Sequence, residues 1–446
     1  MAIDERKSII GWSMYDWANS AFATTIMAGF FPIFFKEYWS LGVDVNVSTA
    51  QLGLANSTAG IIVALSAPIL GAIADRGTAK KKFLLFFAFM GVVMTSTLAM
   101  VSEGYWQLAV FIYVMATIGF SGGNIFYDSL LPGVASEKKL DRVSALGYAL
   151  GYLGGGILFA VNVWMTLKPT TFGLADTVEA VRYSFVCVGI WWAVFTIPLI
   201  LWVKEPKLEN SVSGWQMVRA GYVQLIETFG AIRHMKAIFL FLLAYWLYID
   251  GVDTIVRMAV DYGLSLGFAG NDLIVALLIV QFVGFPAAIG FGYLGGRIGV
   301  RRSIFIALAV YLLVVVWAAL MQEKREFYVM AVVIGLVQGG IQALSRSYYA
   351  RIIPADKTAE FFGFYNMLGK FAVVIGPLLI GGVGLLFRRA GYGELFSTRA
   401  GISSIALLFI AGGVLLYFVD EVQGKKEAQI LSEKTVISQV YSLSDD

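Results

Sequence analysis

The sequence predicts an all-α membrane protein of twelve transmembrane helices, built as two pseudo-symmetric six-helix bundles. Of the 446 residues, 59% are hydrophobic and 14% are Asp, Glu, Lys or Arg, whereas soluble domains carry about 25% charged residues. Apolar runs of about 20 residues, the length that crosses a bilayer as a helix, recur from end to end. The second half of the chain also repeats the spacing of Pro, Gly and basic residues found in the first half.

The apolar runs define the spans, and the longest connection divides the chain. The spans are expected at residues 9–36, 51–74, 83–101, 105–134, 143–167, 182–203, 236–262, 272–296, 303–321, 327–352, 360–387 and 401–419. The sequence therefore predicts four regions, an N-terminal bundle (1–203), a cytosolic linker (204–235), a C-terminal bundle (236–420) and a cytosolic tail (421–446).

The linker itself carries a helical pattern. Its apolar residues recur at helical spacing, at Trp215, Val218, Tyr222, Leu225 and Phe229. This pattern predicts either an interfacial helix lying on the membrane or a helix in solvent.

Basic residues orient the chain in the membrane. Lys and Arg gather in the connections on the side of the N-terminus, as in Lys80-Lys81-Lys82 and Arg301-Arg302, and are sparse on the other side. By the positive-inside rule both termini are expected in the cytosol, with the chain in a bacterial inner membrane.

Four pairs of landmarks carry the repeat between the halves. They are Pro68 with Pro286, Gly122-Gly123 with Gly339-Gly340, Pro132 with Pro354, and Arg76 with Arg297. Because the members of each pair are separated by nearly the same number of residues, we infer that both halves descend from one six-helix unit. Parallel halves of this kind are the architecture of major-facilitator transporters.

The loop after the second span is the most specific motif. Gly71-Ala-Ile-Ala-Asp75-Arg76-Gly77, followed by a basic run, resembles the loop signature of the major facilitator superfamily, and Gly292 to Arg302 is a degenerate second copy. We expect Asp75 to cap a neighbouring helix N-terminus and Arg76 to anchor the cytosolic face. The alternative, simple positive-inside charge, accounts for the basic residues but not for an Asp among glycines.

Two further stretches resemble one branch of that superfamily. Residues 15–22 (Tyr-Asp-Trp-Ala-Asn-Ser-Ala-Phe) and 248–255 (Tyr-Ile-Asp-Gly-Val-Asp-Thr-Ile) are similar to the branch that includes the fungal vacuolar amino-acid effluxers of autophagy. Relatives often carry Asn where this chain has Asp253. The resemblance implies an amino acid or a similar zwitterion as solute. It also implies that the first, fourth, seventh and tenth helices line a cavity and that the third, sixth, ninth and twelfth face lipid.

The positions of the charged residues agree with that partition. Residues 83–101, 183–203, 303–321 and 402–419, within the spans expected to face lipid, contain no Asp, Glu, Lys or Arg. An ionisable residue inside a membrane normally faces a partner or water. We therefore expect the buried charges of the other spans to line a solute pathway.

Five residues form the predicted solute and ion site. Asp16 and Asn19 share one face of the first span, and Asp250, Asp253 and Arg257 share one face of the seventh. Asp253 and Arg257 can pair, which leaves Asp250 as the predicted proton-coupling carboxylate, because burial without a dedicated cation disfavours the ionised form. The alternatives are a polar helix-packing patch in the first span and a structural Asp–Arg–Asp network in the seventh.

A second set of charges predicts a gate. Asp128 lies in the fourth span, and Arg346 and Lys370 lie in the tenth and eleventh, so opposite charges stand in opposite halves. We expect them to close the cytosolic side by an ion pair, together with Asp75 and Arg76 of the loop motif. The alternative is that Asp128 pairs with Arg76 within its own half.

These observations predict a secondary transporter that moves a small polar solute by alternating access, coupled to protons. An exporter of drugs or siderophores is the first alternative, and a membrane sensor or lipid-handling protein is the second. No enzyme, cofactor, metal or nucleic-acid partner is expected, since Cys187 and His234 are the only residues of their kinds and no nucleotide-binding loop occurs. Lipid is the expected surroundings and a monomer the expected state.

Overall fold

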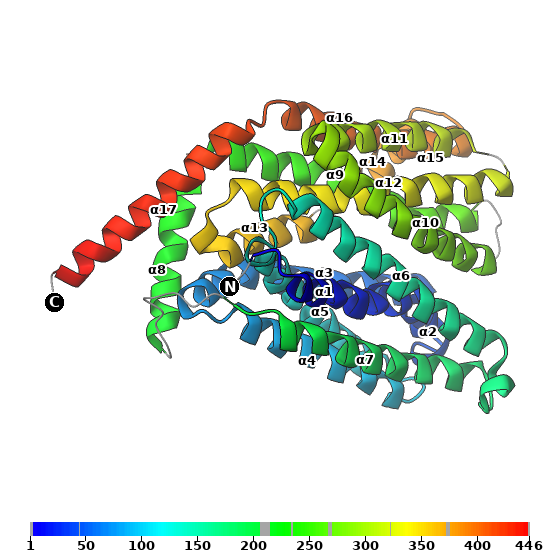
Figure 1. Cartoon of the computed structure of the whole chain (residues 1–446). Helices are drawn as coiled ribbons and strands as arrows, with labels where there is room; N and C mark the ends of the chain where they lie inside the picture. Colours follow the sequence, from blue (N-terminus) through cyan, green and yellow to red (C-terminus); the bar gives the residue numbers. More distant parts are fainter. Residues whose placement is uncertain are drawn as a thin grey trace.

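The computed structural model describes residues 3–43, 45–205, 215–232, 235–265, 270–321, 323–371 and 375–444, which form helices joined by short connections (Figure 1). The helices of the first half are α1 (Arg6–Ala21), α2 (Phe31–Phe34), α3 (Val45–Gly77), α4 (Lys80–Thr97), α5 (Trp106–Val134), α6 (Leu140–Leu167) and α7 (Thr177–Trp202). A π-helical segment, Phe22–Phe30, joins α1 to α2, and a second one, Phe35–Trp39, extends α2, so that a single span runs over Arg6–Trp39.

The linker and the second half are helical in the same way. Their helices are α8 (Trp215–Ile232), α9 (Lys236–Ser265), α10 (Gly270–Ile298), α11 (Val300–Leu320), α12 (Lys324–Ile352), α13 (Thr358–Phe371), α14 (Ile375–Arg389), α15 (Glu394–Ser403), α16 (Ala406–Tyr417) and α17 (Glu421–Ser444). Short 3-10 turns occur at Leu98–Met100, Pro169–Phe172 and Ala355–Lys357.

The predicted spans are found as helices. Within the described residues, 11 candidate membrane spans are long and apolar enough to cross a bilayer. The predicted eleventh span corresponds to α13 and α14, which lie on either side of residues 372–374, outside the described residues. The twelfth is formed by α15 and α16 together, from Phe396 to Tyr417.

The halves form two bundles related by pseudo-symmetry, as predicted. In Figure 1 the helices from α1 to α7 lie in one layer and those from α9 to α16 in the other. The bundles meet chiefly where α3 packs on α13 and α6 packs on α10. These are the second span on the eleventh and the fifth on the eighth. The repeat relates the second span to the eighth and the fifth to the eleventh, so it converts one contact into the other. Two equivalent contacts of this kind are expected when a six-helix unit is repeated.

Burial agrees with the predicted partition of the spans. In α1, α5, α9 and α12, the first, fourth, seventh and tenth spans, 61–67% of the most apolar window is buried inside the protein. In the third, sixth, ninth and twelfth spans the share is 33–44%. The four spans without charged residues are thus more exposed than the four predicted to line the cavity, as lipid-facing helices should be, although the eighth span, at 22%, is more exposed still.

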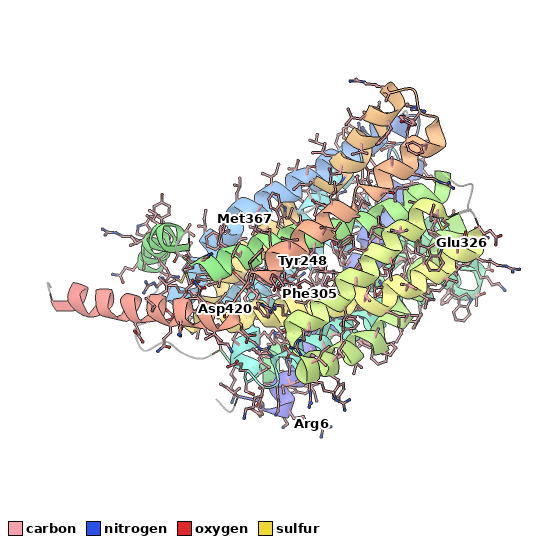
Figure 2. All side chains as sticks on the ribbon, turned by 90° about the horizontal axis from the view of Figure 1, so that it is seen from above. Arg6, Tyr248, Phe305, Glu326, Met367 and Asp420 are labelled. Atoms are coloured by element: carbon pink, nitrogen blue, oxygen red, sulfur yellow. The ribbon has the colours of Figure 1, made fainter. Side chains whose placement is uncertain are left out.

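The two ends of the bundles differ. At one end, which we call the α8 end, α3 finishes at Gly77, α13 begins at Thr358, and α8 and α17 lie outside the bundles (Figure 1). At the opposite, far end α10 begins at Gly270 and α12 at Lys324. Figure 2 shows Asp420 at one end of the molecule and Glu326 at the other, with Tyr248 between them.

Helix α8 crosses the α8 end and joins both halves. Gly221 packs so tightly on Ile73 of α3 that an added Cβ would lie 2.7 Å from its Cα. Gln224 donates a hydrogen bond to the buried carboxylate of Glu360 in α13, at 2.6 Å. The opposite face of α8 exposes Trp215, Tyr222 and other apolar side chains. An apolar outer face is the property expected of an interfacial helix.

Candidate functional site

A cavity of about 420 Å³ lies between the two halves. Its lining comes from the first span, α5 and α6 on one side and from α9, α10, α12 and α13 on the other. The first, fourth, seventh and tenth spans, predicted to line a cavity, all contribute. The cavity runs from Arg346 toward the far end, because Leu273 and Phe327, in the first turns of α10 and α12, belong to its lining.

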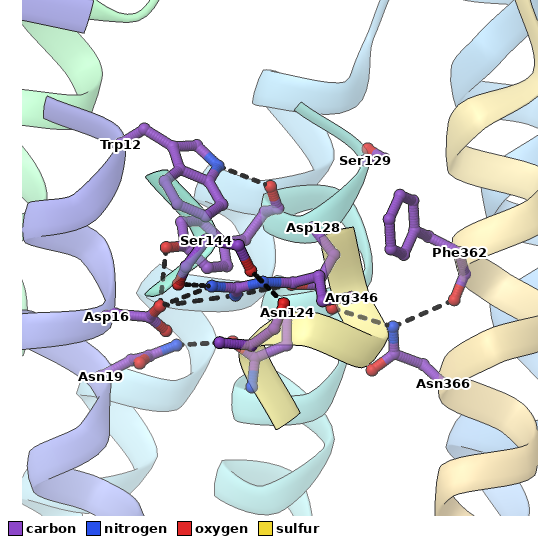
Figure 3. A network of polar contacts seen from close by, with 12 residues as sticks. Trp12, Asp16, Asn19, Asn124, Asp128, Ser129, Ser144, Arg346, Phe362 and Asn366 are labelled. Carbon is purple, nitrogen blue, oxygen red and sulfur yellow. Dashed lines mark hydrogen bonds and ion pairs between the residues drawn. The ribbon is translucent and has the colours of Figure 1, made fainter. Parts of the chain in front are cut away.

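The side chain of Arg346 forms the floor of the cavity. It projects from α12 of the second half into the first half and is only 2% exposed. Its NH1 donates to Asp128 Oδ1 at 3.0 Å, and NH1 and NH2 lie 3.4 and 3.3 Å from Asp16 Oδ2 (Figure 3). Nε and NH2 also donate to the hydroxyl and carbonyl oxygens of Ser144, both at 2.9 Å. The guanidinium thus joins three helices of the other half.

Aromatic rings cover the same guanidinium. Its central carbon lies 4.3 Å from the ring centre of Tyr148, 4.8 Å from that of Trp12 and 5.3 Å from that of Tyr127. The Trp12 indole is fixed by a hydrogen bond from Nε1 to the Tyr127 carbonyl oxygen, at 2.9 Å. Rings at these distances attract a cation through their quadrupoles, so they stabilise the inserted arginine in addition to its ion pairs.

Close packing of α1 on α6 positions Asp16. A Cβ at Gly151 would lie 2.5 Å from Ser20 Oγ and 3.3 Å from the Asp16 carbonyl oxygen, so a larger residue there would crowd α1. Tyr127 donates a hydrogen bond to Asp16 Oδ2 at 2.8 Å. One turn along α1, Asn19 Nδ2 donates to Asn124 Oδ1 at 2.6 Å. Asp16 and Asn19 therefore line the cavity side by side, as their shared helix face predicted.

The three residues predicted for the site in the seventh span do not lie together in the cavity. Asp253 lines the cavity, as expected. Arg257 continues α9, but its side chain lies outside the described residues, as does that of Lys370 in α13. The predicted pairing of Asp253 with Arg257 and the gating role of Lys370 remain predictions.

Asp250 is not in the cavity, which corrects the prediction. Its side chain is fully buried, Oδ2 accepts a hydrogen bond from the Ile375 backbone at 3.0 Å, and Oδ1 accepts from the Gly376 backbone and the Thr254 hydroxyl, both at 3.1 Å. Ile375 and Gly376 open α14, so Asp250 of α9 caps the N-terminus of a helix in the eleventh span. The sequence signal for this helix start was Pro377, which commonly lies in a first turn.

The loop motif also forms a cap, between the halves. Asp75 accepts hydrogen bonds from the backbone nitrogens of Ala359 and Glu360, at 3.1 and 2.8 Å, at the start of α13. Lys80 lies 2.9 Å from Asp75 and also donates to Thr358 Oγ1. The expectation that Asp75 caps a neighbouring helix is confirmed, and the helix belongs to the other bundle.

Asp128 and Arg346, two of the predicted gate residues, lie in contact between the halves, but one contact differs from the prediction. Asp128 lies against Arg346 of the opposite half rather than against Arg76. The Nε of Arg76 is buried and has no hydrogen-bond partner among the described residues. The difference is Asp16, predicted for the solute site, which shares Arg346 with Asp128.

Sequence reasoning missed several contacts between the halves. At the α8 end Asp141 accepts hydrogen bonds from Ser347 at 2.7 Å and from Arg351 at 2.6 Å. Within the cavity Gln281 donates to Thr24 Oγ1 at 3.0 Å. Asp141 and Arg351 stand at span ends, where charges are expected anyway, so nothing in the sequence distinguished them.

Comparisons with known proteins agree with this architecture. The family model for vacuole effluxer Atg22-like proteins matches residues 40–429. The chain belongs to this family. The MFS-type transporter YxiO of Bacillus subtilis is 38% identical over 419 residues, which cover 92% of this chain and 94% of that protein. Autophagy-related protein 22 of Coccidioides immitis is 23% identical, with 96% and 89% covered.

Solved structures show the same fold. The proton:xylose symporter XylE, a major facilitator superfamily protein, superposes with a TM-score of 0.69 at 12% identity over 95% of this chain and 97% of its own. A bacterial homologue of the iron transporter ferroportin superposes with a TM-score of 0.63 at 13% identity, over 92% and 98%. This Atg22-like chain is therefore a multi-pass transporter of the major-facilitator type and not an enzyme.

Proposed function

We propose that the chain moves a small polar solute, an amino acid or a similar zwitterion, by alternating access coupled to protons. One observation carries the proposal. Arg346 of the second half is inserted between Asp16 and Asp128 of the first half, directly beneath a cavity bounded by both halves. Closing one end of a cavity by contacts that can break when the halves rock is the working principle of this transporter class.

The closed end is, on our proposal, the cytosolic end. The contacts of Arg346 form the floor of the cavity, those of Asp75 and Asp141 lie between this floor and the α8 end, and basic residues cluster in the connections there. The cavity then extends toward the non-cytosolic side in this state. Opening at the cytosol would require breaking each of these contacts.

The lining supports a small zwitterion. Carboxylates, one guanidinium and the amides of Asn124, Gln338, Gln342 and Asn366 border a volume suited to a small molecule. The tyrosines of the lining, including Tyr148 and Tyr152, favour the second candidate, an exporter of larger flat drugs or siderophores, because aromatic faces stack on such molecules.

Proton coupling through Asp250 would act on a helix cap. A carboxylate that accepts two backbone N–H groups caps α14 best when it is ionised. Protonation would weaken this cap and free the start of α14 to move against α9. Asp250 could therefore couple proton binding to helix movement even though it is buried away from the cavity.

Counterflow in proteoliposomes tests the proposal. Purified protein is reconstituted in vesicles preloaded with unlabelled amino acids, and the entry of each labelled amino acid is measured. We expect exchange of at least one amino acid and its loss in Arg346→Ala. Exchange of drugs or siderophores with no exchange of any amino acid would favour the second candidate, and no exchange of either would refute the proposed solutes.

A further inference from the structure

We propose that the floor of the cavity is a subsite for a primary ammonium group, with Asp16 as its acceptor, and that Arg346 does not receive the carboxylate of the solute. The inference rests on the proposed transport of a zwitterion and orients that zwitterion in the cavity. An arginine at the end of a cavity would ordinarily be assigned to an anionic group, so the hydrogen bonds of this arginine decide the question.

Every donor of Arg346 is already engaged. A guanidinium has five N–H groups. The structure gives Arg346 five hydrogen bonds, from Nε to Ser144 Oγ, from NH1 to Asp128 and Asp16, and from NH2 to Asp16 and the Ser144 carbonyl. Rings of Trp12 and Tyr148 lie over the guanidinium as well. A solute carboxylate could bind here only by displacing a protein carboxylate.

At the floor of the cavity the carboxylates outnumber the cationic groups. When both carboxylates are ionised, Asp16 and Asp128 carry two negative charges against the one positive charge of Arg346. Arg346 is the only cation among the lining side chains that the structure describes. The tyrosine hydroxyls nearby, such as that of Tyr127, add no charge when protonated. A positively charged group would therefore be attracted to the floor.

One carboxylate oxygen remains available to receive it. All hydrogen bonds that Asp16 accepts from the described side chains end on Oδ2, namely those from Tyr127 and from both terminal nitrogens of Arg346. The other oxygen, Oδ1, accepts no hydrogen bond from the described residues, and Figure 3 shows it with no dashed line, on the side toward Asn19. The Asp16 side chain keeps 12% of its surface exposed, at the cavity.

Neutral acceptors extend the same chemistry along α12. Gln338, Gln342 and Arg346 are spaced four residues apart and all line the cavity, so they form one face of that helix. Gln338 Oε1 is buried and has no hydrogen-bond partner among the described residues. An ammonium has three N–H groups to donate and no acceptor, which matches unpaired carboxylate and amide oxygens.

Two families of probes separate the two ends of a zwitterion. The amides of the L-amino acids keep the ammonium and lack the carboxylate, and the N-acetyl L-amino acids keep the carboxylate and lack the ammonium. Ligand binding raises the apparent thermal stability of the purified protein by mass action. We expect at least one amide to stabilise the wild-type protein and no N-acetyl acid to do so. Stabilisation by N-acetyl acids, or by neither family, would overturn the subsite.

Variants then assign the effect to Asp16. Asp16→Asn keeps the shape and can still accept from Tyr127 but removes the excess charge, and we expect amide affinity to fall at least about tenfold. Asp16→Glu, which keeps the charge, should retain part of the binding. Asp4→Asn is the matched control, because Asp4 accepts hydrogen bonds from Ser136 within its own half and does not line the cavity. Equal losses in Asp16→Asn and Asp4→Asn would contradict the assignment.

Counterflow of free amino acids distinguishes this inference from the proposed function. If amino acids exchange but N-acetyl amino acids bind and amino-acid amides do not, the proposed transport function is retained and the proposed orientation of the zwitterion is wrong. If amides bind but no amino acid exchanges, the ammonium subsite stands and the proposed solute class fails.

Discussion

Asp128→Asn should open the α8 end of the protein. The substitution keeps the volume of the side chain and removes the charge that faces Arg346 NH1 at 3.0 Å. Loss of a whole buried pair costs about 3–5 kcal/mol. Here the guanidinium keeps Asp16 and Ser144, so the loss is nearer that of one hydrogen bond to a charged group, about 2 kcal/mol. That energy corresponds to about a 30-fold shift of the closed–open equilibrium.

Cysteine labelling measures this shift. Ser347→Cys is a nearly isosteric reporter, because Ser347 is fully buried against Asp141 of the opposite half and becomes accessible only when the halves separate there. The native thiol is removed by Cys187→Ala. We expect a membrane-impermeant thiol reagent to label the reporter about 30-fold faster in the Asp128→Asn background. Asp4→Asn, a charge change within one half, serves as control and should leave the rate unchanged. An unchanged rate in folded Asp128→Asn would refute the gate.

Three further outcomes are expected. Asp250→Asn should yield a folded protein that still exchanges solute but no longer accumulates it along a pH gradient, and retained accumulation would exclude Asp250 as the coupling site. Gly151→Val should lower the free energy of unfolding by about 1–3 kcal/mol, seen in thermal unfolding, because its Cβ would lie 2.5 Å from Ser20 Oγ. The hydrogen bond from Lys425 lowers the pKa of Glu137, so this docking contact of α17 is present above the ordinary value of 4.5 and is lost as the pH falls through the lowered pKa. A spin label on α17 should then gain mobility in acid, and Lys425→Ala should remove that transition.

The sequence predicted the fold and much of the site because membrane burial makes charge informative. A charged side chain inside a bilayer is costly, so Asp16, Asp128 and Arg346 had to face one another or water. Their placement in opposite halves predicted a contact between bundles, and the structure brings Asp128 and Arg346 together. The resemblance to the major facilitator superfamily then implied which spans lie inside.

The partner of each buried carboxylate could not be predicted, because it depends on how each helix is rotated about its axis and how far it is shifted along it. The sequence does not give these two quantities. The helical stripe of Asp16 predicted its face but not that this face meets Arg346 as well as the solute pathway. The sequence offered Asp250 no basic side chain as a partner. In the structure its partners are instead the backbone nitrogens of Ile375 and Gly376. The first backbone N–H groups of a helix are free to bind a carboxylate, and a search for oppositely charged side chains in the sequence does not find them.

Closure and solute recognition are linked through Asp16. In the closed state two carboxylates share one guanidinium, so one negative charge is left unbalanced when both are ionised. An ammonium at Asp16 Oδ1 would offset this charge without competing for Oδ2, where Arg346 and Tyr127 donate. In a state in which Arg346 has withdrawn, the two carboxylates carry more unbalanced charge but are hydrated, so their desolvation opposes the binding of a cationic group there. Because a ligand shifts an equilibrium only by its differential affinity, the balance of these two effects sets whether bound solute holds the halves closed or lets them separate.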